Sequence, residues 1–365
     1  MNYSKISPNI DWSKPSLGAR QIALLEQLSN ANAVSGDEGA VRKIVYEQVK
    51  SLADELQVDA LGNLLVTKKG KDRNRPRVMV AAHMDEIGFM LTHDEGKGIF
   101  RFAVVGGIDP RQLAGKQVLV GSDHVPGIIG QTPVHLLSSS ERASTVKVDS
   151  LRIDVGPKNG SKLKTGDRAT FATKFTRLGP SLRGKALDDR IGVATLIFLL
   201  QNAPTNIDLL AAFTVQEEIG RRGAAAAAYN LAPDMGFALD CTPALDMPNW
   251  DGSENTQYRS KPDHGPAIYV GDGATLSDPR LVGLLRAAGD AYKIPYQLRQ
   301  PGGGATDASS ILIQREGIPA VSVSVPGRYL HTAAAIVQLK DWKNHLALIQ
   351  ATLRHITPNT LKIPR

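Results

Sequence analysis

Two kinds of sequence pattern alternate along the chain, and their order is the feature that most constrains the fold. Continuously apolar runs bounded by turn residues are typical of strands buried in a parallel sheet. Segments with helical spacing of apolar residues lie between these runs. We expect strands at residues 62–67, 77–82, 209–214, 235–240, 267–270 and 319–325, and helices at residues 38–56, 190–201, 223–230, 278–292, 305–316 and 339–355. This alternation predicts an open α/β sheet with helices on both faces.

A stretch of different character interrupts the alternation. Residues 88–177 are rich in Gly, Val and Thr, and turn signals separate short runs at residues 99–105, 117–120, 145–155 and 168–172. Short strands without long helical periodicity indicate a small all-β module. The predicted fold class is therefore a doubly wound, mixed α/β domain, made of residues 1–87 and 178–365, with a β-barrel inserted at residues 88–177. Residues 1–19 are predicted to form an arm whose role stays open.

Composition excludes several other classes of protein. Hydrophobic residues make up 42% and charged residues 22% of the chain, which is ordinary for a globular protein. No apolar run reaches the roughly 18 residues of a membrane span, and the start of the chain lacks the apolar core of a secretory signal. The single cysteine excludes an intramolecular disulfide framework. We therefore expect a cytoplasmic protein without a membrane partner.

The basic surplus does not indicate a nucleic-acid-binding protein. The chain has 43 Lys and Arg against 36 Asp and Glu, a net charge of +7, but the basic residues are scattered and aromatic residues are only 5%. Neither a basic helix nor a stacking platform emerges from this pattern. We expect no nucleic-acid partner.

Chemically active residues gather where the predicted strands end. Functional side chains of open parallel sheets lie just beyond the carboxyl ends of the strands. In this chain those positions, together with the start of the apolar helix, hold His83, Asp85, Asp188, Asp189, Glu217, Glu218, Asp240 and His331. Two histidines with several carboxylates suit divalent ions such as Zn²⁺, Co²⁺ or Mn²⁺. A pair of such ions also needs a carboxylate that bridges them.

Each of these features has a simpler structural explanation when taken alone. His83 could be a buried histidine with satisfied hydrogen bonds, and Asp240 could cap a turn. Asp188 and Asp189 could cap the following helix, where carboxylates favour the helix dipole. Residues 217–218 could begin a solvated helix. Their recurrence at successive strand ends favours a metal site over several unrelated explanations.

Six strings, in order, resemble one family closely. They are VMVAAHMDEIGFM (78–90), GKALDDRIG (184–192), TVQEEIGRRGA (214–224), GFALDCT (236–242), GGGATDA (302–308) and SVPGRYLHT (324–332). The chain resembles the tetrahedral aminopeptidases, whose members are also called glutamyl aminopeptidase or endoglucanase M. The likeness extends from about residue 20 to 355.

The resemblance implies a site of two divalent metal ions, zinc or cobalt, with manganese also compatible. His83, Asp188 and Asp240 would bind one ion, and Asp188, Glu218 and His331 the other, so that Asp188 bridges them. Glu217 would be the general base, and Asp85 would orient His83. The family fold is a peptidase domain with an inserted PDZ-like barrel, and its members form hollow homo-oligomers, typically dodecamers, that degrade short peptides.

Four residues around the motifs need separate comment. The resemblance places Thr306 and Asp307 beside the specificity pocket, although the glycine run before them is also compatible with a structural turn. Cys241 reads as a buried small residue rather than a ligand. Family members commonly have an acid four positions after the second histidine, where this chain has Ala335. This chain therefore lacks the acidic side chain that would support His331 in those family members.

The sequence is compatible with three functions. The main hypothesis is a metal-dependent aminopeptidase in which Glu217 activates a metal-bridging water. The first alternative is a peptide-binding assembly of the same fold that has lost turnover. The second is a glycosidase, which would use two carboxylates without a metal pair. The preferred N-terminal residue of the substrate cannot be read from the sequence.

Overall fold

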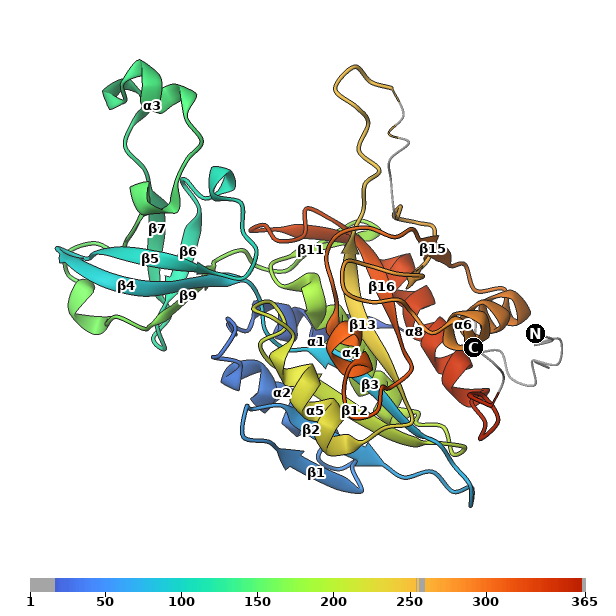
Figure 1. Ribbon diagram of the computed structural model, residues 1–365. Helices are drawn as coiled ribbons and strands as arrows, with labels where there is room; N and C mark the ends of the chain where they lie inside the picture. Colours follow the sequence, from blue (N-terminus) through green and yellow to red (C-terminus); the bar gives the residue numbers. More distant parts are fainter. Residues whose placement is uncertain (1–16, 254, 256–259, 363–365) are drawn as a thin grey trace.

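The computed structural model describes residues 17–253, 255 and 260–362. It consists of a body built on a large mixed sheet and a closed barrel that projects from one side of this body (Figure 1). Nearly all of the predicted arm at residues 1–19 lies outside the described residues. The first helix, α1, begins where that arm was expected to end.

Parallel strands form the centre of the large sheet, and antiparallel strands form its flanks. The strand order is β1 (Glu55–Val58), β2 (Leu64–Lys68), β12 (Asp208–Thr214), β3 (Arg77–His83), β13 (Met235–Pro243), β16 (Ala320–Arg328), β17 (Ala335–Gln338), β11 (Ser181–Gly184) and β10 (Thr176–Leu178), while β14 (Ala267–Tyr269) pairs with β16 and β15 (Gln297–Arg299) pairs with β14. The four neighbours β12, β3, β13 and β16 run parallel. Their carboxyl ends therefore meet at one edge of the sheet.

Helices cover both faces of this sheet, as the doubly wound pattern predicts. The helices are α1 (Ala19–Asn30), α2 (Gly39–Val49), α4 (Leu187–Gln201), α5 (Arg222–Leu231), α6 (Pro279–Tyr292), α7 (Asp307–Leu312) and α8 (Leu339–Arg354). Along β3, Val78 and Val80 pack into the core beneath α1, α4 and α8, whereas Met79 and Ala81 pack beneath α5 and α7. Successive residues of a strand point to opposite faces, so an unbroken apolar run fills both cores.

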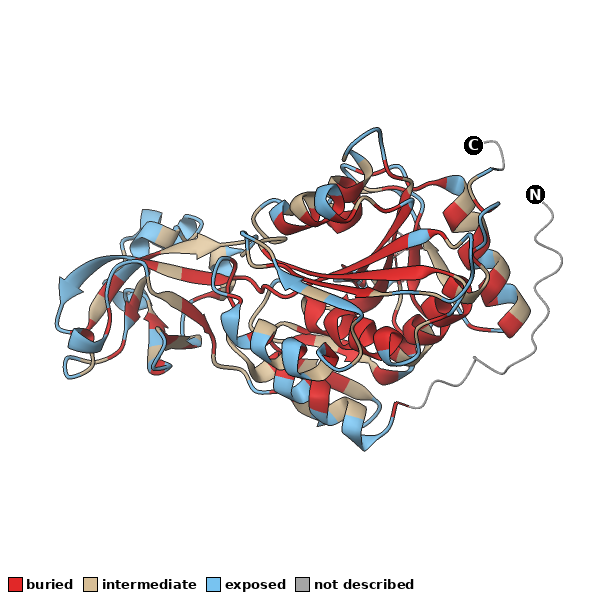
Figure 2. Cartoon of the chain, turned by 90° about the horizontal axis from the view of Figure 1, so that it is seen from below, coloured by how far each residue is buried: buried red, intermediate tan, exposed pale blue. Residues whose placement is uncertain are grey.

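Helix α4 lies deepest in the body. Its residues from Asp189 to Leu200 are buried, because the helix packs between the sheet and the outer helices α1, α2 and α8. Figure 2 shows the strands of the large sheet and the helix segments next to them in the colour of buried residues. A helix that is apolar on all sides is expected in such a position. In the described part of the chain, no helix is both long enough and apolar enough to cross a bilayer.

The barrel closes in the order β4 (Gly88–Gly96), β5 (Ile99–Val105), β8 (Arg152–Asp154), β7 (Val125–Gly130), β6 (Gln117–Val120) and β9 (Arg168–Phe171). It has its own apolar core, separate from the two cores of the body. The ring of Phe89 makes edge contacts with Phe102 and Phe171, at centroid distances of 5.2 and 5.3 Å. Closure leaves the short strands without open sheet edges.

Some predicted elements differ from those observed. The helix expected over residues 38–56 ends at Val49, and Glu55–Val58 is an edge strand, β1, that extends along β2. The strand expected over residues 145–155 is reduced to β8, preceded by a 3₁₀ turn at Val148–Ser150. Residues between β7 and β8 instead leave the barrel and form the short helix α3 (Ser139–Ala143) (Figure 1). Helix α1 and the flanking strands β10, β11 and β17 were not predicted.

One buried histidine makes the body sensitive to acid. His345 of α8 is fully buried, and its Nε2 donates to the carbonyl of Val323 on β16, at 3.0 Å. Nδ1 has no hydrogen-bond partner. Burial lowers the pKa of His345 to about 4, because the charged imidazolium would be desolvated.

We predict that His345→Gln makes the protein less sensitive to acid. In the wild type the unfolded chain takes up a proton near pH 6.5, while the folded chain resists protonation until about pH 4. Stability is therefore complete above pH 6.5 and falls by roughly 3 kcal/mol as the pH drops towards 4. Urea unfolding of chelator-treated protein at several pH values measures this loss. His93→Gln, at an exposed histidine of the barrel, is the control, and identical pH profiles for all three proteins would contradict the prediction.

Candidate metal centre

The chemically active residues converge at the sheet edge where the parallel strands end. His83 is the last residue of β3 and is paired in register with Thr214, the last residue of β12. Asp240 lies near the end of β13, opposite Ser324 of β16. The loop after β12, the loop after β16 and the start of α4 bring the other members to the same place. The structure thus gathers His83, Asp188, Glu217, Glu218, Asp240 and His331 around one cavity.

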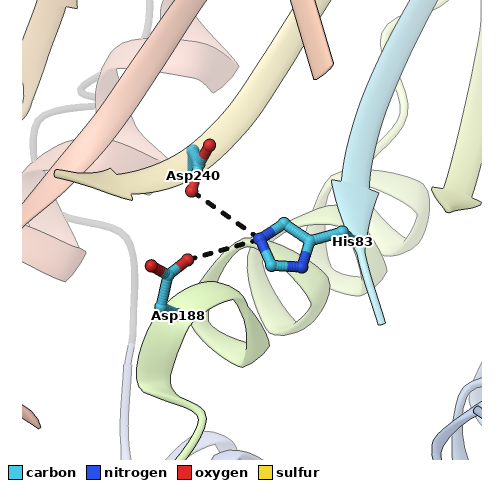
Figure 3. A group of neighbouring side chains, drawn as sticks. All are labelled: His83, Asp188 and Asp240. Atoms are coloured by element: carbon cyan, nitrogen blue, oxygen red, sulfur yellow. Dashed lines mark ion pairs between the residues drawn. The ribbon is translucent and has the colours of Figure 1, made fainter. Parts of the chain in front are cut away.

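The first group consists of His83, Asp188 and Asp240. Nε2 of His83 lies 3.3 Å from Oδ1 of Asp188 and 3.8 Å from Oδ1 of Asp240. Figure 3 shows both carboxylates facing this one nitrogen. The three ligand atoms lie within 4.8 Å of one another, a spacing that could hold a metal ion.

The second group consists of Asp188, Glu218 and His331. Nε2 of His331 lies 3.5 Å from Oε2 of Glu218 and 3.8 Å from Oδ2 of Asp188. These ligand atoms also lie within 4.8 Å of one another. Asp188 contributes one oxygen to each group, which is the arrangement that a bridging carboxylate requires.

Both imidazole rings present their Nε2 atoms to carboxylates. Nδ1 of His83 lies 3.1 Å from the carbonyl oxygen of Asp85, and Nδ1 of His331 lies 2.8 Å from that of Gly107. A carbonyl accepts only, so each Nδ1 carries the proton that forms this contact. In the neutral ring Nε2 then has a lone pair that faces carboxylate oxygens. The lone pair and the carboxylate oxygens repel each other, and only a cation between them, either a proton or a metal ion, can offset this repulsion.

Buried negative charge at the cluster is incompletely balanced. Burial, followed by the nearby charge of Asp188, raises the pKa of Asp240 to about 8. Burial also raises the pKa of Glu218 to about 7. Oδ1 of Asp188 is buried without a hydrogen-bond partner. An orphaned carboxylate oxygen at the point shared by both groups fits a metal ligand.

Asp85 contacts both His83 and the loop that carries Glu217. Its carboxylate accepts hydrogen bonds from the backbone N–H groups of Glu217 and Glu218, at 3.0 and 3.1 Å, and from the Ser35 hydroxyl at 2.6 Å. Nδ1 of His83 is 3.5 Å from that carboxylate and closer to the Asp85 carbonyl. That Asp85 orients His83 stays a prediction, and its side chain also holds the loop that carries Glu217.

Glu217 lines the cavity beside both groups but belongs to neither. Burial raises the pKa of its carboxyl well above the usual value, and the neighbouring carboxylates, Asp307 foremost, act in the same direction. Glu218 is turned inwards, with a side chain only 5% exposed. The simpler interpretation of these residues as the start of a solvated helix is therefore wrong.

The interpretation of the aspartate pair as a helix cap is right for one member. Oδ1 of Asp189 accepts a hydrogen bond from the backbone N–H of Gly192, at 2.9 Å, in the first turn of α4. Asp188 instead turns its carboxylate towards the two histidines. The peptide bond between Asp188 and Asp189 is cis.

The base of the barrel supports His331 in place of the missing acid. Besides the contact of Nδ1 with the Gly107 carbonyl, the side-chain amide of Gln112 donates to the backbone carbonyl of His331, at 2.8 Å. Ala335, where family members commonly have an acid, is buried in β17 and pairs with Gly184. Backbone and amide groups after β5 thus replace a carboxylate that this chain lacks.

The cavity next to the cluster has a volume of about 410 Å³. Thr306 lines it, as expected for a substrate contact, and also caps α7. Asp307 does not line it: its Oδ2 accepts a hydrogen bond from the Thr214 hydroxyl behind the cavity wall, at 2.6 Å. The predicted contact of Asp307 with substrate stays a prediction. Two lining residues, Tyr269 and Arg299, were missed, because neither belongs to a recognisable motif.

A buried ion network holds the segment before Asp188. Both oxygens of Glu86 accept hydrogen bonds from Nζ of Lys185, at 2.6 and 2.7 Å, and the backbone N–H of Ala33 donates to the same carboxylate. Arg190 approaches it at 3.4 Å. These charged side chains are almost completely buried. The network ties the start of α4 to the end of β3.

Comparison with known sequences supplies independent information. The sequence profile of M42 glutamyl aminopeptidase matches residues 62–348. A putative aminopeptidase of Acetivibrio thermocellus is 34% identical over 331 residues, covering 89% of this chain and 96% of the relative. The lysyl aminopeptidase of Pyrococcus furiosus is 31% identical, covering 92% and 97% of the two chains.

Solved structures agree with the sequence comparison. The aminopeptidase APDkam598 of Desulfurococcus kamchatkensis superimposes with a TM-score of 0.88 at 33% identity, covering 95% of this chain and 98% of its own. A TET1 peptidase of Pyrococcus horikoshii, described as able to assemble into a tetrahedron or a large octahedral shell, gives a TM-score of 0.80 at 30% identity. That match covers 92% of this chain and 100% of the other.

Lys185→Met tests the buried network. We expect it to lower the free energy of unfolding by about 3 kcal/mol, because removing one partner leaves the buried Glu86 carboxylate poorly compensated. Lys50→Met is the matched control, since its pair with Glu47 is about half exposed and should contribute little to stability. Urea unfolding measures both values. Equal effects of the two substitutions would contradict the prediction.

Proposed function

Because the chain belongs to the M42 glutamyl aminopeptidase family and is a metal-dependent aminopeptidase, we propose that it removes N-terminal residues from short peptides at the cluster around Asp188. His83, Asp188 and Asp240 would hold one divalent ion, and Asp188, Glu218 and His331 would hold a second. Glu217 would act as the general base. Zinc, cobalt or manganese would suit this set of nitrogen and oxygen ligands.

The observation that carries the proposal is the sharing of Asp188 between two ligand groups. Each group pairs Nε2 of one histidine with carboxylate oxygens, and the two groups use different oxygens of Asp188. Oδ1 of Asp188 has no hydrogen-bond partner. The donor set present therefore fits a pair of divalent cations.

The proposed chemistry divides the work between ions and protein. When bound, a pair of divalent cations lowers the pKa of water towards about 7 and polarises a substrate carbonyl. The carboxylate of Glu217 would take the proton from the attacking water and return it to the leaving amine. Asp85 would hold Glu217 in place, because its carboxylate accepts a hydrogen bond from the backbone N–H of Glu217. The free α-amine of the peptide would bind beside the cluster, which confines cleavage to the first residue.

Glu217→Gln separates proton transfer from metal binding. We expect this variant to keep its metal content and to lose about 10²- to 10⁴-fold in turnover, since the amide has nearly the same shape but cannot take a proton. Glu218→Gln is the matched control in the adjacent position, and it should lose metal as well as activity. Hydrolysis of aminoacyl-para-nitroanilides gives turnover, and elemental analysis of the purified protein gives metal content. Full activity of Glu217→Gln, or equal metal loss in both variants, would contradict the proposal.

Self-association into a closed assembly is part of the proposal. Val134 and Leu136, in the excursion between β7 and β8, are exposed, and Trp250 on a loop of the body is 98% exposed. Exposed apolar side chains on projecting segments favour contact with another protein surface. The barrel would then be an assembly module, and twelve copies would make the oligomer. A cytoplasmic location is proposed too, in keeping with the single buried cysteine.

Light scattering coupled to gel filtration tests the assembly. The wild-type chain should elute with a mass of twelve subunits. We expect the double substitution Val134→Ser and Leu136→Ser to shift the distribution towards smaller species, because it removes apolar area from the contact. A wild-type chain that elutes as a monomer at micromolar concentration would contradict the proposal.

A further inference from the structure

We propose that Glu38 and Asn63 are positioning residues for the reaction at the metal centre. Together with Asp85, their side chains hold the backbone of residues 215–218 in one conformation and thereby place the carboxylate of Glu217. The inference rests on the proposed function, since it concerns the residue assigned there as the general base. Neither Glu38 nor Asn63 lines the cavity or belongs to a group of candidate metal ligands.

The segment 215–218 follows β12, and side chains rather than backbone carbonyls accept its N–H groups. Four consecutive N–H groups are bound in this way. The acceptors are Oδ1 of Asn63 for Val215 at 2.9 Å, Oε1 of Glu38 for Gln216 at 3.2 Å, Oδ1 of Asp85 for Glu217 at 3.0 Å and Oδ2 of Asp85 for Glu218 at 3.1 Å. Backbone N–H groups that are shielded from water need partners, and here three distant parts of the chain supply them.

The carbonyl groups of the same segment have local partners. The carbonyls of residues 215–217 accept from the N–H groups of residues 220–223, at distances from 2.8 to 3.2 Å. Asn63 joins both ends of this turn, because its Nδ2 donates to the Gly223 carbonyl at 3.0 Å. A Cβ at Gly223 would lie 2.3 Å from Oδ1 of Asn63, so glycine is needed for this close approach. The local bonds close the turn, and the side-chain bonds tie it to the rest of the body.

The two side chains that hold the turn are themselves fixed. Asn63 is fully buried, and its Nδ2 also donates to Oδ2 of Asp59 at 2.6 Å. Glu38 is 4% exposed, and its Oε1 also accepts from the backbone N–H of Gly36 at 2.6 Å, at the start of α2. Side chains that are buried and bonded on more than one side can define the position of a neighbouring loop.

One residue of the turn has an unfavourable backbone conformation. Gln216 has a φ of +56°, in the left-handed region that residues with a Cβ rarely adopt. Such a conformation persists only where the surrounding contacts impose it. The hydrogen bond from its N–H group to Glu38 is one of these contacts. Removing the Glu38 carboxylate therefore allows the turn to relax next to Glu217.

The Glu217 side chain depends on this turn for its position. Its carboxylate accepts no hydrogen bond from the residues that the structure describes, so its backbone determines where it lies. Glu218 instead faces Nε2 of His331 at 3.5 Å, and a bound ion would hold it there. Relaxation of the turn should therefore displace the general base more than the metal ligand.

Glu38→Ala tests the inference through the separation of kcat from KM. We expect kcat to fall by about 10- to 100-fold with KM and metal content nearly unchanged, since a displacement of about 1 Å at a reacting group can cost about 100-fold. Asn63→Ala should behave in the same way. Glu38→Gln should restore most of the turnover, because an amide oxygen can accept both backbone N–H groups. The substrate is the aminoacyl-para-nitroanilide that the wild type cleaves fastest.

A double substitution shows whether Glu38 acts through Glu217. In Glu217→Gln no base remains to be positioned, so adding Glu38→Ala should lower the residual turnover by less than about 3-fold. A merely structural role of Glu38 would lower turnover by the same factor in both backgrounds.

Asp341→Ala is the matched control. Asp341 is fully buried, and its carboxylate accepts from the backbone N–H groups of Asp263 and Gly265, at 2.7 and 2.9 Å, on a different loop. The substitution removes the same kind of contact as Glu38→Ala, and it should leave kcat and KM unchanged.

Hydrogen exchange of the wild type decides the matter if the variants do not fold. The N–H groups of residues 215–218 should exchange slowly both in the metal-loaded protein and after chelation, whereas the exposed segment 247–253 should exchange fast. Fast exchange of residues 215–218 in both states, or protection only with metal, would overturn the inference.

The kinetic results distinguish failure of the inference from failure of the proposed function. An unchanged kcat in Glu38→Ala, or equal losses in the two backgrounds, would overturn the inference and leave the proposed function intact. Failure of the metal-loaded wild type to cleave any aminoacyl-para-nitroanilide would instead contradict the proposed function.

Discussion

The strongest constraint on this structure is that several carboxylates and two imidazole nitrogens come together in one buried place. Asp188, Glu218 and Asp240 bring carboxylate oxygens to within 4 Å of two Nε2 atoms, in a region from which much of the water is excluded. Such an arrangement is stable only if cations enter it, or if protons replace them. The surrounding elements bring these residues together. The parallel strands β3 and β13 place His83 and Asp240, and the start of the deeply buried helix α4 places Asp188.

Two buried carboxylates near the cluster, Glu86 and Asp85, are compensated within the chain, which distinguishes them from the cluster. Glu86 is surrounded by Lys185, Arg190 and a backbone N–H, and Asp85 accepts three hydrogen bonds. These groups have partners within the chain, so they stabilise the loops that carry the ligands. Oδ1 of Asp188 lacks such a partner.

Sequence patterns predicted the parts of the fold that follow from local periodicity. The run at residues 77–82 is β3, the helix at residues 339–355 is α8, and the all-β stretch forms a barrel. Its limits as a separate domain, at residues 88 and 177, stay a prediction. The edge strand β1 was missed because helical spacing continued into it, and pairing with β2 overrode local propensity. The aminopeptidase hypothesis is confirmed by the family match, which leaves the non-catalytic and glycosidase alternatives without support.

The candidate site was predictable only where motifs named its residues. The five proposed ligands and Glu217 lie together as the resemblance implied, although their roles remain proposals. Tyr269 and Arg299 were beyond reach, because their importance depends on a cavity wall assembled from distant segments. The contact of His331 with the Gly107 carbonyl could not be predicted from residue types, because every residue has a backbone carbonyl.

The contact between His331 and the base of the barrel has a mechanical consequence. The segment that joins the projecting barrel to the body holds His331, a ligand of the proposed second ion. It does so through hydrogen bonds with Gly107 and Gln112. Gly106, in the left-handed region at φ +87°, packs so tightly that a Cβ there would come within 2.7 Å of Ile87 and 3.4 Å of the Cβ of Glu218. A tilt of the barrel relative to the body would therefore shift the imidazole ring of His331. In an assembly, a neighbouring subunit that held the barrel in place would also restrict the position of this ring.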